Sequence, residues 1–205
     1  LAISYNRAGR INEAWNTYQQ VLAQDPNNQS ALKIVGIMGT YRPEWQARGI
    51  EALNTLLKLN PNDIQARSYR ALLYTYQGKV SESLADYEIV LEKNPTSEAI
   101  LGAAQAYNYS RNYQKALELF NRYRATGKPI TGFAVVAYGS ALRETGNPTA
   151  AIQVLEGQLQ RSKTLDRLAI ETRTELAKTY VANQQSAQAV AILEPIQNRP
   201  EAILP

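Results

Sequence analysis

A proline-containing phrase returns along this chain at a nearly constant interval, and it constrains the fold more than any other feature. Prolines stand at positions 26, 61, 95 and 129, at steps of 35, 34 and 34 residues. The first three lie in the phrases QDPNN, LNPND and KNPTS. A fixed period of this length indicates one supersecondary unit that is repeated and stacked along the chain.

Two further columns keep the same interval. In one column an aromatic residue or a leucine recurs, and in the other a small residue stands four positions before it. The large column is Tyr18, Leu53, Tyr87, Phe120, Leu155 and Leu193, and the small column is Ala14, Gly49, Ser83, Ala116, Ala151 and Ala189. We expect the small side chains to let two helices approach closely and the large ones to fill the space between units.

Each interval contains two segments with the spacing of an amphipathic helix. Apolar or small residues between Gly9 and Pro26 recur at steps of three and four, as does the stretch from Pro61 to Gly78. A glycine ends the first helix by taking a left-handed conformation, and a proline ends the second because it cannot continue the hydrogen-bond ladder. The sequence therefore predicts an all-α protein made of helix–turn–helix units.

This pattern resembles the tetratricopeptide repeat (TPR), a helix–turn–helix of about 34 residues. The unit from Ile64 to Ser97 carries Ala71, Tyr74, Gly78, Ser83, Tyr87 and Pro95 in the motif positions. Other matches are Leu1, Ala2, Tyr5, Gly9, Ala14, Tyr18 and Pro26; Ala104, Tyr107, Tyr113, Ala116 and Phe120; Gly139, Leu142, Gly146, Ala151 and Leu155; and Leu176, Ala177, Tyr180, Ala189 and Leu193. The resemblance implies an α-solenoid of about six repeats in a right-handed superhelix.

The predicted organisation is a single TPR array over residues 1–205. Its expected repeats are 1–28, 29–63, 64–96, 97–131, 132–169 and 170–203. Leu1 already occupies a core column, so we expect a truncated first repeat and a longer parent protein. The last helix is not clearly polar, as a terminal repeat should be, so self-association through the uncapped ends is a further expectation.

Three units depart from the motif. The second contains Gly36, Gly39 and Gly49, which add backbone entropy, and we expect it to be the loosest. The fifth carries extra residues before the sixth. The sixth has Pro195 inside its second helix, which predicts that this helix is kinked or cut short.

The composition disfavours an enzyme. The chain contains no His and no Cys, which removes the commonest general base, the usual zinc ligands and thiol nucleophiles. It has no phosphate-binding glycine motif and no apolar run near the ~20 residues that span a membrane. We therefore expect no catalytic residue, cofactor or metal, and no membrane span. The absence of cysteine fits the cytoplasm and the bacterial periplasm alike.

Two groups of charged residues could indicate chemistry. Glu82 with Asp86, and Glu88 with Glu92, are carboxylates four residues apart, which we interpret as a solvated helix face rather than an acid/base or cation site. The net charge of +4 raises the alternative of an RNA-binding helical repeat. The 22 basic residues are scattered, however, with the nearest clusters at Arg122/Arg124/Lys128 and Arg161/Lys163/Arg167, so nucleic acid is the disfavoured partner.

The resemblance also implies where a ligand sits, because the first helices of TPR units line a channel that binds peptides. The motif's groove columns fall on Ile3 and Asn6; Lys33, Ile37 and Thr40; Ser68, Leu72 and Thr75; Leu101, Gln105 and Asn108; Val136, Ser140 and Arg143; and Thr174 and Lys178. The chaperone-binding clamp is not matched, because Ile37, Tyr69 and Glu98 stand where the family uses other residues. Tyr41, Tyr69, Tyr76 and Tyr109 fall outside the core columns, which favours a surface role.

The leading hypothesis is a non-catalytic protein-interaction scaffold that binds an extended peptide or a partner surface in this groove. Because Arg143 and Lys178 make its last third basic, we expect an acidic residue or a carboxyl terminus to bind there. On the same view, reversing both charges should leave the fold intact. The alternatives are a structural segment of a bacterial periplasmic polysaccharide-export or secretion complex, and an RNA-binding repeat.

Overall fold

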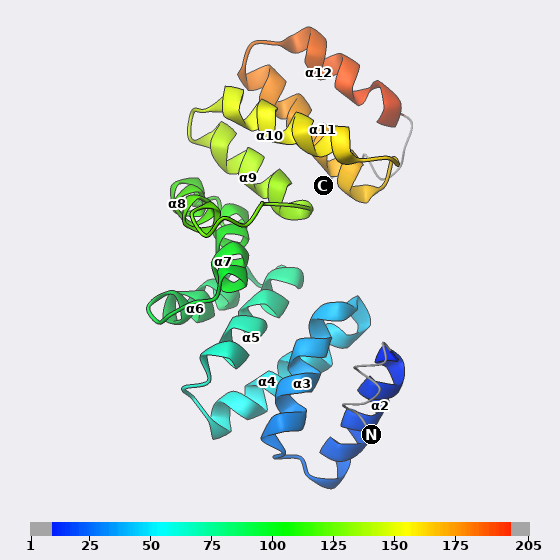
Figure 1. Cartoon of the computed structure of the whole chain (residues 1–205), viewed down its shortest axis with the longest axis vertical. Coiled ribbons are helices and arrows are strands. Elements are labelled where there is room, and N and C mark those ends of the chain that lie inside the picture. Colours follow the sequence, from blue (N-terminus) through cyan, green and yellow to red (C-terminus); the bar gives the residue numbers. More distant parts are fainter. Residues whose placement is uncertain (1–9, 198–205) are drawn as a thin grey trace. The chain divides into compact units, whose positions relative to one another are not determined.

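The computed structural model describes residues 10–197, and within this range the chain forms eleven α-helices, α2–α12, with three short 3-10 helices and no strand (Figure 1). The predicted all-α repeat fold is confirmed. The chain divides into two compact units, residues 1–99 and 100–205. The sequence positions Leu1, Ala2, Ile3, Tyr5, Asn6 and Gly9 lie outside the described residues.

The first unit contains α2 (Ile11–Gln24), α3 (Gln29–Met38), α4 (Gln46–Leu59), α5 (Ile64–Tyr76) and α6 (Val80–Leu91). Two 3-10 turns, η1 (Gly39–Tyr41) and η2 (Pro43–Trp45), connect α3 to α4. In this unit the indoles of Trp15 and Trp45 stack, with ring centroids 4.4 Å apart and planes inclined by 4°.

The second unit contains most of α7 (Ser97–Tyr109), followed by α8 (Tyr113–Arg124), α9 (Phe133–Glu144), α10 (Pro148–Arg161), α11 (Arg167–Ala182) and α12 (Ser186–Leu193). The 3-10 turn η3 (Glu194–Ile196) follows α12 directly. The last helix is therefore cut short just before Pro195, as that proline predicts.

The recurring proline phrase joins the end of one helical repeat to the start of the next. Asn28 and Asp63, each two residues after a proline, accept hydrogen bonds from the backbone N–H groups of Ala31 and Ala66, at 3.0 and 2.9 Å. These side chains are N-caps for α3 and α5, because the first N–H groups of a helix have no partner within it. In these two phrases the proline suits the chain between helices, and the residue two positions later caps the next helix.

The turns between paired helices require a left-handed residue. Gly78 and Gly146 have φ of +69° and +84° there, as predicted. At the equivalent turns Arg111 and Gln184 adopt φ of 63° and 60°, although neither is glycine. In all four turns the next N–H bonds the carbonyl five residues earlier, as Asn112 does to Tyr107 at 2.9 Å. The hydrogen-bonded turn thus imposes the strained backbone on Arg111 and Gln184.

Replacing Arg111 with glycine is expected to raise the free energy of unfolding by about 0.5–1 kcal/mol, because the relief of the left-handed penalty exceeds the entropy that glycine adds to the unfolded chain. Urea titration followed by circular dichroism measures the change. Gly78→Ala is the opposite control and should destabilise, since a Cβ there meets no atom within 4 Å and only the backbone is strained. A loss of stability in Arg111→Gly would show that its side chain has another role.

The predicted core columns form the interior. Ala14, Leu53, Tyr87 and Leu155 are buried, and Phe120 is fully enclosed. Leu193, at the shortened last helix, is only half-buried. Tyr41, Tyr76 and Tyr109 are about half exposed, so the predicted surface position of these three tyrosines is confirmed. The fourth, Tyr69, is partly buried and packs against the core of the first unit.

The glycines of the second predicted repeat lie where helices touch. A Cβ on Gly36 would come within 2.4 Å of the Leu53 side chain, and one on Gly49 within 3.0 Å of the Gly39 Cα. Close packing therefore explains why these positions are glycine, whereas the lower stability expected of this repeat stays a prediction.

One sequence interpretation is wrong at Asp86. This residue, interpreted as part of a solvated face, is only 2% exposed. Its carboxylate accepts hydrogen bonds from Arg67 at 3.0 Å and from Arg70 at 2.7 Å. Glu82, Glu88 and Glu92 are exposed as expected. Asp86 alone of these four turns inward because α5 presents two guanidinium groups to α6 at that point.

Candidate peptide-binding surface

The predicted groove residues of the first unit lie on helices that pack side by side. Helix α3 contacts α5, and the turn η1 contacts α5 as well. Lys33, Ile37 and Thr40 come from α3 and η1, and Ser68, Leu72 and Thr75 come from α5. All six are partly exposed, whereas Asn6 lies outside the described residues.

A hollow of about 470 Å³ opens beside α5. Ser68 and Leu72 line it, together with Tyr69, Val90 and Glu98. No lysine or arginine is among its lining residues. It is thus a concave, mostly apolar site that is large enough for a side chain of a partner.

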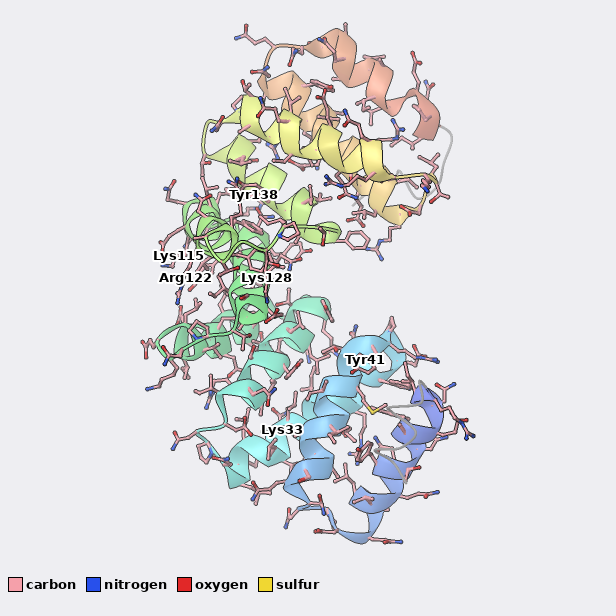
Figure 2. All side chains as sticks on the ribbon, viewed as in Figure 1. Lys33, Tyr41, Lys115, Arg122, Lys128 and Tyr138 are labelled. Atoms are coloured by element: carbon pink, nitrogen blue, oxygen red, sulfur yellow. The ribbon has the colours of Figure 1, made fainter. Side chains whose placement is uncertain are left out.

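Lys33 is occupied by a contact within the fold. Its ammonium lies 2.6 Å from the Asp63 carboxylate, the same group that caps α5 (Lys33 is labelled in Figure 2). Burial acts to raise the pKa of Asp63, but hydrogen bonds from Lys33 and from the Ala66 N–H outweigh it and hold this pKa below its usual range. Lys33 therefore holds α3 to the start of α5 rather than presenting a bare charge.

In the second unit the predicted groove residues come from three first helices. Leu101, Gln105 and Asn108 lie on α7; Val136, Ser140 and Arg143 on α9; and Thr174 and Lys178 on α11. Helix α9 contacts α11 directly. All are partly exposed except Lys178, which is exposed. The Asn108 Oδ1 atom is buried and accepts no hydrogen bond from the described residues.

Arg143 and Lys178 meet around a residue that the sequence analysis missed. The Arg143 Nε donates to Glu175 at 2.9 Å, and a terminal nitrogen of Arg143 donates to Glu144 at 2.6 Å. The Lys178 ammonium lies 3.9 Å from the other oxygen of Glu175. Glu175 is buried, and burial raises its pKa against the opposing attraction of Arg143. Its partner Arg143 stands 32 residues earlier in the chain, so no local pattern in the sequence marked Glu175.

This cluster contradicts the expectation that reversing Arg143 leaves the fold intact. The Arg143 side chain is only 17% exposed, whereas that of Lys178 is 58% exposed. A glutamate at position 143 would face the buried Glu175 with like charge and remove its main partner, which is strongly destabilising. The physical reason is that Arg143 already balances Glu175 and Glu144 and is not a bare anchoring charge.

No group of three or more metal-ligating His, Cys, Asp or Glu side chains occurs within residues 10–197. None of the helices in that range combines the length and the apolar character needed to cross a membrane.

Two family models, both described as tetratricopeptide repeat, match the chain. One matches residues 70–129 and 101–163, and the other matches residues 1–28, which together are more than half of the 205 residues. The chain belongs to the tetratricopeptide repeat family. TPR proteins are in general non-catalytic interaction modules, and membership supports a protein-interaction scaffold. No curated protein gives a significant match to this TPR chain.

Solved TPR structures share the fold. A TPR protein from Parabacteroides merdae ATCC 43184 has a TM-score of 0.68 at 18% identity, covering 96% of this chain and 76% of its own. PilW, a type IV pilus biogenesis factor, has a TM-score of 0.71 at 18% identity, with coverage of 98% and 93%. YrrB, a TPR protein with an unusual peptide-binding site, has a TM-score of 0.65 at 12% identity, with coverage of 90% and 95%. Such low identities show the fold alone.

Proposed function

We propose that this chain is a non-catalytic scaffold that binds an extended segment of a partner protein along its first helices. The observation that carries the proposal is the hollow beside α5, which two of the predicted groove residues, Ser68 and Leu72, help to form. A first helix that leaves an apolar residue partly exposed beside such a hollow suits a partner side chain better than solvent.

The chemistry of the hollow defines the segment that fits it. Leu72 and Val90 offer apolar contact, and Gln65 and Ser68 offer hydrogen bonds to a peptide backbone. Glu98 contributes the only charge to the lining. The first unit therefore favours a segment with an apolar side chain.

The alternative of a structural segment in a bacterial assembly has one point of support. PilW, a pilus biogenesis factor, covers nearly the same length of fold. A likeness of fold at 18% identity does not separate this role from a general scaffold. The two roles differ in whether binding needs the first helices, and the experiment below measures that.

The test measures how two matched substitutions change the affinity for selected peptides. Peptides that bind the wild-type protein are first isolated from a displayed random library. Leu72→Asp is then expected to lower their affinity at least about tenfold, because it places a charge in the apolar hollow. Ile89→Asp makes the same chemical change on the exposed face of α6 and should leave the affinity unchanged. Fluorescence anisotropy measures both, and circular dichroism checks that each variant is folded.

Equal affinities for Leu72→Asp and the wild type would move the binding surface away from the first helices and favour the assembly role. Binding of single-stranded RNA with a steep salt dependence, in place of peptides, would favour the RNA-binding alternative.

A further inference from the structure

A second hollow lies in the second unit, and none of the predicted groove residues lines it. It has a volume of about 520 Å³, and all of its lining comes from residues 124–161. The end of α8, the loop from Gly127 to Ile130, and one face of α9 and α10 enclose it. Figure 2 labels Lys128 and Tyr138 in this part of the chain. Val136, Ser140 and Arg143 do not line it.

The lining has charges of one sign only. Arg124, Lys128 and Arg161 contribute to it, and no aspartate or glutamate does. Arg124 and Arg161 form no ion pair with any described residue. Arg124 instead donates to the Tyr138 hydroxyl at 3.0 Å, and Arg161 makes a long hydrogen bond of 3.4 Å to Gln158. Two guanidinium groups thus converge on one hollow with their charges unbalanced, in contrast to Arg143.

The floor of the hollow is aliphatic. Ile130, Val135, Leu142 and Val154 line it, and Tyr138 is its only aromatic residue. One face of that ring lies under Arg124, whose guanidinium carbon is 5.8 Å from the ring centroid, and Phe120 packs against it at 5.2 Å. The ring is therefore not offered as a platform for stacked bases, which single-stranded RNA requires. A bulky aliphatic or aromatic side chain of a protein fits such a floor better.

Gly157 supplies an independent observation. It lies within α10 and lines the hollow, yet a Cβ built on it would meet no atom within 4 Å. Glycine inside a helix costs about 1 kcal/mol relative to alanine. At Gly36 and Gly139 the side chains of Leu53 and Leu155 explain the glycine, but no atom of the chain does so at Gly157. The bare helix surface leaves room for a group that is not part of this chain.

We infer that the hollow formed by α8, α9 and α10 binds an acidic segment of a partner protein, with one bulky apolar side chain on the aliphatic floor and carboxylates on Arg124 and Arg161. The arginines suit this role because a guanidinium binds a carboxylate through two parallel hydrogen bonds. The acidic ligand that the sequence analysis assigned to Arg143 and Lys178 is thus assigned to a different surface, which none of the predicted groove residues lines. It does not depend on the groove proposed for the first unit.

The experiment measures the binding of an array of short peptides to the whole chain. Each peptide carries one Leu, Ile, Met or Phe among Asp and Glu residues, and a matched peptide carries Asn and Gln instead. We expect the best acidic peptides to bind at least about tenfold more tightly than their amide counterparts, with an affinity that falls as salt rises. An array in which acidic and amide peptides bind equally overturns the proposal.

Substitutions then locate the site. Gly157→Leu fills the hollow without removing a native contact, so it should abolish binding while the melting temperature is kept or raised. Arg161→Gln should weaken binding about tenfold. The matched controls are Gln160→Leu on the exposed side of α10 and Arg122→Gln on α8, and both should bind as the wild type does.

Leu72→Asp should leave the affinity for the acidic peptides unchanged, because Leu72 belongs to the hollow beside α5. The two proposals can therefore fail independently of each other. Acidic peptides that bind Gly157→Leu as well as the wild type would overturn the assignment. So would an oligouridylate that binds in their place and is lost with Gly157→Leu and Arg161→Gln.

Discussion

Replacing Asp86 with alanine is expected to lower the free energy of unfolding by about 3–5 kcal/mol, because it leaves two guanidinium groups largely buried without their counter-charge. Arg67 and Arg70 both donate to this carboxylate, and their side chains are only 16% and 19% exposed. The hydrogen bond to Asp86 also raises the pKa of the Arg70 guanidinium. Because Arg70 donates to Asn54 at 2.8 Å as well, the cluster connects α4, α5 and α6.

Urea unfolding followed by far-ultraviolet circular dichroism measures this loss. Glu82→Ala, on the same helix but exposed, should change the free energy of unfolding by less than about 0.5 kcal/mol. A loss below about 1 kcal/mol in Asp86→Ala would mean that the arginines find other partners or reach water. Asp86→Asn keeps the shape and some hydrogen bonds, and we expect an intermediate loss.

Replacing Phe120 with alanine should lower the free energy of unfolding by about 3–5 kcal/mol, since it empties a fully enclosed position in the second unit. The ring of Phe120 lies 5.2 Å from that of Tyr138, so it joins α8 to α9. The cavity left behind could close only if these two helices moved.

Phe133→Ala is the matched control for Phe120→Ala. Phe133 begins α9 and is 43% exposed, with Arg167 over its ring at 5.7 Å. Its loss should cost about 1 kcal/mol or less, most of it the cation–π contact. Equal losses in the two variants would show that Phe120 is not the packing residue that its column predicts.

The sequence could predict those parts of the fold that depend on interactions between residues close together in the chain. The phrase around Pro61 contains both a residue suited to the segment between helices and the N-cap Asp63, and each acts within a few residues of itself. The position of Phe120 was predictable because its column repeats. The left-handed turn at Arg111 was harder to place, since the hydrogen bonds of the turn override the preference of arginine.

The spacing of the carboxylates along a helix could not predict which of them is buried. Asp86 and Glu82 are one helical turn apart, and only the arginines on the neighbouring helix decide that one of them is buried. Likewise, the sequence indicated that Arg143 is a free cation of the groove, whereas in the structure it pairs with Glu175. The second hollow brings Arg124 and Arg161 together from two clusters that are far apart in the sequence, so no local pattern could show that they converge.

The stacked indoles of Trp15 and Trp45 give the protein a spectroscopic signal that belongs to one unit. They are the only two tryptophans in the chain, and both lie in the first unit. Intrinsic tryptophan emission therefore reports the first unit alone, whereas the helical signal reports both. In repeat proteins, different parts of the array can differ in stability, so the two signals need not change at the same urea concentration. The damage caused by Asp86→Ala can thus be told apart from that caused by Phe120→Ala without any added label.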